Sequence, residues 1–288
     1  MTTTHPTLLE ADARTPCCRC DGFVDTELTV ALPAAEVCLD CLTPAERGQL
    51  ERDLNEVQDV DRALLSEVPR VGGWDVARLE RPARLLSGDF HDLTCNGDGQ
   101  ELCIIVGDVM GDGLPAALLR SALLGALRAL LPEHRSPATV LTRAAPQLNR
   151  ATRRFASAFC GRIDAGGGLS YANAGHLPPL VRRRDGTWES LATTGPAFGL
   201  LPGADYEERR IALAPGDLLV LCSDGVIEAA DGAGSPFTDA KLRHAVDAGD
   251  DLSAAAVVRR VDAAVAQFAA DGGGDDMTLL ALRRNERV

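Results

Sequence analysis

The stretch LCIIVGDVMGDGLPAALLRSALLGALRAL, residues 102–130, joins an apolar strand to an apolar helix through a glycine-rich turn. Turns of this kind often bind phosphate at the N-terminus of the helix. Here, however, the strand ends on a lone acid, Asp108, and the turn has neither the lysine of GxxxxGK[ST] nor the spacing of GxGxxG. A carboxylate repels a phosphate, so this turn would bind one only if a positive group lies between the two.

The composition of the 288-residue chain is that of an ordinary globular protein, with 45% hydrophobic and 25% charged residues. The formal net charge of −13 argues against nucleic acid and against a membrane surface as partners, because both require an excess of lysine and arginine. No apolar run reaches the roughly 18 residues that span a bilayer. The N-terminus lacks the pattern of a secretory signal. We therefore expect a cytoplasmic protein.

Residues 1–43 contain two Cys-x-x-Cys pairs, Cys17 with Cys20 and Cys38 with Cys41. Their spacing is typical of a four-cysteine zinc site, and so small a segment has almost no core of its own to hold it together. The pattern predicts a zinc-binding module, in which Cys18 competes with Cys17 for one ligand position. A fortuitous cysteine cluster or a redox site is the alternative interpretation.

Residues 44–68 are predicted to form a helical linker. Thr43 and Glu46 have the spacing of a capping box, and Pro44 suits the first turn of a helix. The apolar side chains recur at alternating four- and three-residue steps, as in a short coiled coil, with Asp61 in one core position. The seam consists of Leu50, Leu54, Val57 and Leu64. An amphipathic helix packed on its own domain fits the pattern equally well, whereas a coiled coil would join two copies of the chain as a homodimer.

From residue 69 to residue 288 the pattern is that of one α+β domain, with strands in antiparallel-looking runs and helices grouped between them. Helices are expected at about 114–131, 136–150 and 253–270, and the first carries alanine and leucine on nearly every face, which predicts burial. DAGGGLSYA, residues 164–172, is typical of a hairpin turn. The strand segments are LCIIVGDV, ASAFCGRID, LSYANAG, DLLVLCSDG and MTLLALRR.

Acidic residues recur beside glycine or serine at the edges of these apolar runs. They are Asp89, Asp108, Asp224 and the adjacent pair Asp275 and Asp276. Any single one of them has the alternative role of a turn former. If they converge, each close pair costs on the order of 4 kcal/mol at an effective dielectric of 20 unless a cation lies between them. All-oxygen ligands favour Mg²⁺ or Mn²⁺ over zinc.

Five ordered motifs resemble those of bacterial PPM-type (PP2C-like) serine/threonine phosphatases, in the subgroup of the sporulation and stress-response phosphatases SpoIIE and RsbU. The motifs are LLSGDFHDL, GDVMGDGLPAALL, YANAGHLPPLV, LAPGDLLVLCSDGVIEA and DDMTLLALR. The resemblance covers about residues 70–285 and leaves out the cysteine segment. It implies an αββα sandwich, two antiparallel sheets with helices outside.

The resemblance also implies a metal centre. Asp89, Asp108, Asp224 and Asp275 match the ligand aspartates of the family, and the carbonyl of Val109 matches its backbone ligand. Asp92 and Asp276 are nearby acids with weaker claims, as a supporting group or as a ligand of an additional ion. Two Mn²⁺ or Mg²⁺ ions about 4 Å apart would activate a bridging water for in-line attack on phosphoserine or phosphothreonine.

The chain departs from eukaryotic-type members of the family at Met110, which stands where they have a histidine proposed as the proton donor. The subgroup generally lacks that histidine, so activity is still expected, with His91 and His176 as candidate proton donors. For His176 a structural hydrogen-bonding role is the favoured interpretation. Asp112 stands where relatives often have His, Asn or Lys, and no role is assigned to it.

Relatives in this subgroup dephosphorylate an anti-sigma factor antagonist, and they commonly join a sensor to the phosphatase through a helical linker. The resemblance therefore implies a phosphorylated regulatory protein as the partner. Binding or loss of zinc would then bias the linker helix, unless the zinc module only docks a partner or dimerises. The competing functions are a catalytically inactive domain that binds a phosphoprotein, and an adaptor built around the zinc module.

Overall fold

The computed structural model describes residues 14–16, 20, 23–25, 29–32, 35–38, 41–64, 67–96, 99, 101–111, 113–151, 154–269 and 274–286. Its contacts divide the chain into two compact units, Met1–Val60 and Asp61–Val288.

The first unit contains two short antiparallel ribbons and most of helix α1 (Pro44–Leu64). Strand β1 (Arg14–Pro16) pairs with β2 (Phe23–Asp25), and β3 (Thr29–Leu32) pairs with β4 (Ala35–Cys38). The predicted capping box is confirmed: the main-chain N–H of Thr43 donates to Glu46 Oε2 at 2.8 Å, and that of Glu46 donates to Thr43 Oγ1 at 3.3 Å. Helix α1 buries none of its side chains within the described structure, so its coiled-coil seam stays a prediction.

The four cysteines of the predicted zinc module are only partly described. Cys20 lies in a turn and Cys41 just before α1, whereas Cys38 ends β4 without a described side chain. Cys17, with its competitor Cys18, lies outside the described residues. Zinc binding by this segment therefore stays a prediction.

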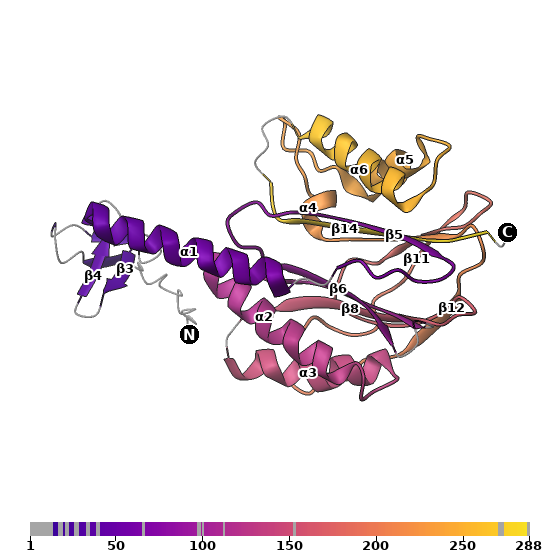
Figure 1. Ribbon diagram of the computed structural model, residues 1–288, viewed down its shortest axis with the longest axis horizontal. Helices are drawn as coiled ribbons and strands as arrows, with labels where there is room; N and C mark the ends of the chain where they lie inside the picture. The colour runs from indigo at the N-terminus through magenta and orange to yellow at the C-terminus, as the bar shows by residue number, and fades with distance from the viewer. Residues whose placement is uncertain are drawn as a thin grey trace, which may run out of the picture. The chain divides into compact units, whose positions relative to one another are not determined.

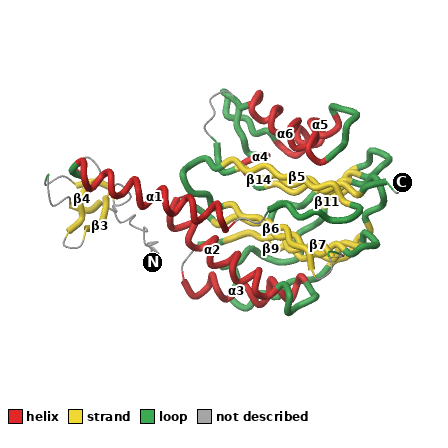
Figure 2. Tube along the Cα trace, viewed as in Figure 1, coloured by secondary structure: helices red, strands yellow, loops and turns green. Residues whose placement is uncertain are grey.

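The second unit is built on two five-stranded antiparallel sheets, drawn in yellow in Figure 2. The order of strands is β11-β10-β13-β14-β5 in one sheet, called the C-terminal sheet here, and β12-β9-β8-β7-β6 in the other, called the central sheet. The C-terminal sheet comprises β5 (Trp74–Arg81), β10 (Leu180–Arg182), β11 (Trp188–Ser190), β13 (Leu218–Cys222) and β14 (Met277–Arg284). The central sheet comprises β6 (Asp89–Asn96), β7 (Glu101–Val109), β8 (Ala156–Ile163), β9 (Gly168–Ala174) and β12 (Arg209–Ala212).

Helices cover the outer face of each sheet, as Figure 1 shows for the second unit. Helices α2 (Gly113–Leu130) and α3 (Pro137–Ala151) pack on the central sheet through a cluster that includes Leu127 and Phe90. Helices α4 (Asp224–Ile227), α5 (Thr238–Asp247) and α6 (Ala254–Phe268) lie on the C-terminal sheet. A third apolar cluster, with Phe159 and Leu280, fills the space between the sheets. The domain is the predicted αββα sandwich.

Most of the predicted elements agree with the structure to within one or two residues, and β14 matches MTLLALRR at both ends. The hairpin is confirmed, since β8 and β9 pair through a turn in which Gly167 has φ +83°. The prediction that α2 is largely buried is wrong: six of its 18 residues are buried, and Leu114 and Leu118 are 42% and 62% exposed. Alanine and leucine on a helix do not by themselves require a partner on every side.

Helix α2 is also long and apolar enough to cross a bilayer by length and composition. Its packing argues instead for a core helix of the domain. Leu123 and Leu127 are buried in the cluster that covers the central sheet, and the same helix places a buried charged residue, Arg120, against that sheet.

Candidate metal centre

Three of the predicted acids converge where the two sheets meet. Asp89 begins β6 and lies directly opposite Asp108 of β7 in the antiparallel ladder. Asp224 comes from the other sheet, two residues after the end of β13, and begins α4. One carboxylate oxygen of each residue lies within 4.8 Å of the others. The structure therefore brings together three acids that are separated by up to 135 positions along the chain.

Glycine is required beside this triad because the backbones approach closely. A Cβ atom on Gly88 would lie 2.7 Å from the carbonyl oxygen of Val109 and 3.0 Å from Oδ1 of Asp108. The main-chain N–H of Val109 in turn donates to the carbonyl of Gly88 at 3.2 Å. The Val109 carbonyl and the Asp108 carboxylate thus both face Gly88. Because glycine has no side chain, these two groups can approach its backbone closely.

Two hydrogen bonds between Ser223 and Thr278 hold together the strand ends that carry Asp224 and its neighbours. The N–H of Ser223 donates to the carbonyl of Thr278, and the N–H of Thr278 donates to Ser223 Oγ, both at 2.9 Å. A Cβ atom on Gly225 would collide with the carbonyl of Asp276. Asp224 is therefore mounted on a rigid turn, as a ligand position requires.

Burial and mutual repulsion raise the pKa values of all three acids. The pKa of Asp89 is raised well above its usual value, chiefly by burial, although the nearby hydroxyl groups of Ser223 and Thr278 act in the opposite direction. Burial and the charge of Asp224 raise the pKa of Asp108 to about 7. The pKa of Asp224 is raised by burial and by the charge of Asp275. Three such groups ionise together only if a positive charge offsets their repulsion.

The donor set suits a hard divalent cation. Asp89 Oδ2 is buried and has no hydrogen-bond partner, which is a costly arrangement for a carboxylate oxygen unless a cation contacts it. All the side chains of the triad offer oxygen, the ligand that Mg²⁺ and Mn²⁺ prefer. The residues present therefore fit Mg²⁺ or Mn²⁺.

The fold and the triad agree with a family comparison. The model of the family described as "Stage II sporulation protein E (SpoIIE)" matches residues 98–285, about two thirds of the chain. The chain belongs to the SpoIIE family of PP2C-type phosphatases.

Individual relatives support this SpoIIE-family assignment. The chain is 30% identical over 189 residues to "Phosphoserine phosphatase RsbU" of Bacillus subtilis, covering 62% of this chain and 55% of RsbU. It is 28% identical over 255 residues to "Protein IcfG" of Synechocystis, covering 76% of this chain and 39% of that protein. The SiaA-PP2C domain of Pseudomonas aeruginosa shares the fold, with a TM-score of 0.72 and 21% identity over 84% of this chain and 99% of that domain. The chain thus spans about half or less of the length of these two curated relatives.

The remaining acids of the SpoIIE-family motifs lie around the triad. Asp275 is exposed and lies outside the group of three, yet its charge contributes to the raised pKa values of Asp108 and Asp224. Asp276 is buried, and its Oδ1 and Oδ2 accept the main-chain N–H groups of Ala83 and Gly88 at 2.7 and 2.9 Å. This geometry favours a supporting role for Asp276, holding the loop before Asp89, over that of a metal ligand.

Asp92 and His91 have partners of their own. Both oxygens of Asp92 accept hydrogen bonds from Arg128, at 2.8 and 3.0 Å, so Asp92 fits the supporting role that the resemblance allowed it. The imidazole of His91 is completely buried, with Glu80 2.8 Å from Nδ1 and Arg78 2.6 Å from Nε2. Those partners, both from β5, orient His91 within the protein interior, which argues against a role as proton donor.

His176 is held in a hydrogen-bonded corner between β9 and β8. Its Nδ1 lies 2.7 Å from Ser157 Oγ, and its main-chain N–H donates to Asn173 Oδ1 at 2.8 Å. Burial lowers the pKa of His176 to about 4, so its ring is neutral near pH 7. This supports the structural interpretation of His176.

The two positions at which the chain departs from its relatives are Met110 and Asp112. Met110 is 46% exposed, and Asp112 lies outside the described residues.

Arg120 is a residue of this site that the sequence patterns did not single out. It is 3% exposed within α2, and its Nη1 donates to the carbonyl of Asp89 at 3.0 Å, while Nη2 forms an ion pair with Asp61 of α1. The signal available in the sequence was an arginine inside an otherwise apolar helix, since a buried charge needs a partner.

Proposed function

We propose that this chain is a Mn²⁺- or Mg²⁺-dependent phosphatase that hydrolyses phosphoserine or phosphothreonine on a partner protein. The observation that carries the proposal is the triad of Asp89, Asp108 and Asp224, which converges from both sheets of a PP2C fold and leaves a buried carboxylate oxygen without a partner. Asp275 and the Val109 carbonyl complete the proposed ligand set for two ions.

Bound ions would lower the pKa of a water molecule and neutralise the phosphoryl oxygens. The residues of the chain position that centre. Asp108 and Asp89 are kept in register by the β6–β7 ladder, and Asp276 holds the loop before Asp89. Ser223 donates its hydroxyl to the carbonyl of Asp276 at 3.2 Å, so it acts as a structural residue beside the triad rather than as a nucleophile.

The relatives support the proposed substrate class. RsbU is named a phosphoserine phosphatase, and the resemblance to its subgroup supports a phosphorylated anti-sigma factor antagonist as the partner. The strongly acidic chain argues against nucleic acid as a partner, and we propose that the protein acts in the cytoplasm.

The N-terminal segment enters this proposal only as a regulator. The proposed domains are a zinc module at 1–43, a helical linker at 44–68 and a phosphatase domain at 69–288. Zn²⁺ at Cys17, Cys20, Cys38 and Cys41 would stabilise the module, and the linker helix would be the place where two copies associate.

The test is hydrolysis of an aryl phosphate and of a phosphoserine peptide, with and without Mn²⁺. The wild-type chain should require Mn²⁺, and Asp108→Asn and Asp224→Asn should each lower kcat/KM at least 100-fold while the circular dichroism spectrum is retained. Asp250→Asn, at an exposed aspartate outside the triad, is the matched control and should keep wild-type activity. Equal, metal-independent rates for all four proteins would refute the proposal.

A further inference from the structure

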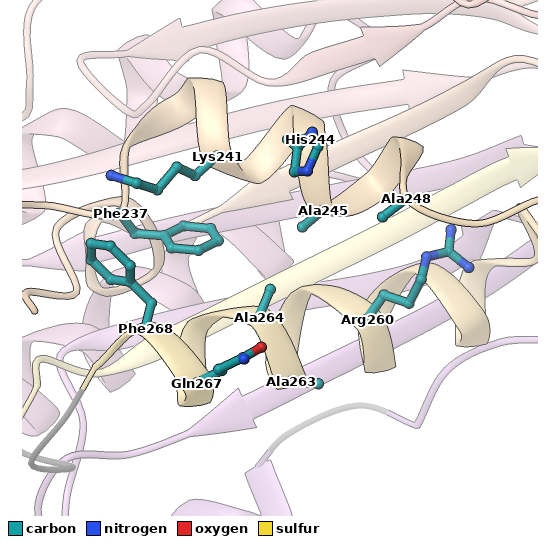
Figure 3. Close-up of a pocket in the computed structure, with 10 residues that line it drawn as sticks. All are labelled: Phe237, Lys241, His244, Ala245, Ala248, Arg260, Ala263, Ala264, Gln267 and Phe268. Carbon is teal, nitrogen blue, oxygen red and sulfur yellow. The ribbon is translucent and has the colours of Figure 1, made fainter.

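A groove of about 490 Å³ lies between α5 and α6, on elements that carry none of the triad. Figure 3 shows side chains from both helices facing this space. Its volume falls in the range of small-molecule sites, which is roughly 300–1,000 Å³. The lining residues are Phe237, Lys241, His244, Ala245, Ala248, Arg260, Ala263, Ala264, Gln267 and Phe268.

The charge of the groove is opposite to that of the chain. The chain has 42 acidic against 29 basic residues, yet none of the ten lining residues is acidic. Lys241, the single lysine of the chain, His244 and Arg260 line the groove together. The groove is therefore a local basic site on an acidic protein, which favours an anionic ligand.

The two permanent cations of the groove are held by carbonyl groups. Arg260 Nη1 donates to the carbonyl of Asp251 at 2.6 Å and Nη2 to that of Val246 at 2.9 Å, while its Nε is buried without a partner. Lys241 Nζ donates to the carbonyl of Pro236 at 3.0 Å. Carbonyls orient a cation without neutralising its charge. Asp251 interacts electrostatically with Arg260, and Asp231 with Lys241, but neither acid forms an ion pair with the cation, so both charges remain to attract an anion.

The neighbouring arginine of α5 provides a contrast. Arg243 forms an ion pair with Asp239, in which its Nε lies 2.8 Å from Oδ1. Among the ion pairs of the described residues, none involves Lys241, His244 or Arg260. Within the described structure, Lys241 and Arg260 therefore differ from Arg243, whose charge is offset by an ion pair.

The rest of the lining is apolar and suits a flat ligand body. Phe237 and Phe268 meet edge to face with ring centroids 5.5 Å apart and an angle of 70°, and Lys241 Nζ lies 4.4 Å from the centroid of Phe268. Four alanines, with their small side chains, leave the space between the helices open. In Figure 3 the two phenyl rings and Lys241 lie at one end of the groove and Arg260 lies at the other.

We propose that this groove binds a small organic anion with a flat apolar body, such as an aromatic carboxylate. The apolar body would lie on the alanines and the phenyl rings, and the anionic group would contact Lys241 or Arg260. The bulky side chains at both ends of the groove favour a small molecule over a docked helix, which has to extend past them. The site is separate from the proposed phosphatase centre.

The test is calorimetric titration of the full chain with 2-naphthoate and with its neutral analogue 2-naphthamide. The carboxylate should bind at least tenfold more tightly than the amide. Lys241→Gln should weaken its binding at least fivefold, and Ala264→Leu, which fills the groove, should abolish binding. Arg243→Gln, at the paired arginine beside the groove, is the matched control and should bind as the wild type does.

Two outcomes would overturn the proposal. The first is equal binding of carboxylate and amide, or unchanged naphthoate binding in Ala264→Leu when its circular dichroism spectrum is native. The second is a Glu-rich helical peptide that binds more tightly than naphthoate and is lost in the same variants, which would assign the groove to a protein partner. Aryl phosphate hydrolysis by all these variants should equal that of the wild type, because the groove contributes nothing to the triad.

Discussion

Arg120 donates a hydrogen bond from Nη1 to the main-chain carbonyl of Asp89 at 3.0 Å, so a side chain of α2 fixes the backbone of a predicted metal ligand. The same guanidinium forms an ion pair with Asp61 near the end of α1. Because Arg120 is almost completely buried, its place in the structure depends on both partners. This arrangement makes Arg120 a positioning residue for the metal centre.

Replacing Arg120 should therefore weaken metal binding more than it lowers the rate of hydrolysis at saturating metal. Arg120→Gln should raise the Mn²⁺ concentration at half-maximal aryl phosphate hydrolysis about tenfold, equivalent to about 1.4 kcal/mol. The rate at saturating Mn²⁺ should fall less. Arg128→Gln, which removes the partner of Asp92 from the same helix, is the matched control and should affect stability more than the Mn²⁺ requirement. An unchanged Mn²⁺ requirement in Arg120→Gln would contradict the positioning role.

Gly88→Ala should disturb the part of the metal centre formed by Asp108 and the Val109 carbonyl. The added Cβ would lie 2.7 Å from the Val109 carbonyl and force that backbone to shift. We expect at least a tenfold loss of kcat/KM at fixed Mn²⁺, measured with an aryl phosphate. Gly72→Ala adds the same methyl group where no atom lies within 4 Å, and it should leave activity intact. Similar losses in the two variants would show that the effect is not one of close approach at Val109.

Metal binding should depend on pH through Asp108. In the metal-free protein the folded-state pKa of Asp108 is about 7, above its usual value of 3.8, because of burial and neighbouring acids. A raised carboxyl pKa contributes stability that is fully present below the unfolded value and lost as the pH rises through 7. Mn²⁺ requires the ionised form, so the rise in melting temperature on adding Mn²⁺ should be larger at pH 8 than at pH 6. Asp108→Asn should reduce this difference, and an equal Mn²⁺ effect at both pH values would exclude Asp108 as the titrating ligand.

His176 should make the fold sensitive to acid. Burial lowers its folded-state pKa to about 4 from 6.5, so the unfolded chain binds a proton that the folded chain does not between those values. The contribution of His176 to stability therefore falls as the pH falls from 6.5 towards 4, by about 2 kcal/mol between pH 7 and pH 5, whereas the raised pKa of Asp108 acts in the opposite direction over this range. Urea denaturation of the wild type and of His176→Gln at pH 7 and pH 5 separates the contribution of His176 from that of the acids. His176→Gln should be less stable at pH 7 but should lose less on acidification, and parallel losses in both proteins would contradict this assignment.

The elements nearest the site were largely predictable from the sequence because their signals are local. The apolar run before Asp108 and the alanine- and leucine-rich run after it define β7 and α2 to within one residue or so. The run after Asp276 likewise defines β14. Helix α5 was missed because polar residues interrupt its apolar face, and it is stabilised by packing on α6 instead.

The detailed roles around the triad depended on tertiary contacts that no spacing reveals. Sequence patterns gave Asp275 and Asp276 similar surroundings, but the fold buries only Asp276 and turns its oxygens towards the loop before Asp89. The register of β6 and β7, which places Asp89 opposite Asp108, is equally invisible in the separate motifs. The role of Arg120 depends on the packing of α2 against β6, which the sequence does not show.

The triad draws Asp89 and Asp108 from the central sheet and Asp224 from the end of a strand in the C-terminal sheet. An ion held by all three would cross-link the two sheets of the sandwich. Metal occupancy and the spacing of the two sheets would then be reciprocally coupled: any change that separates the sheets lowers the metal affinity, and metal binding opposes that separation by the same free energy. The metal affinity of such a centre would therefore report how closely the two sheets are packed.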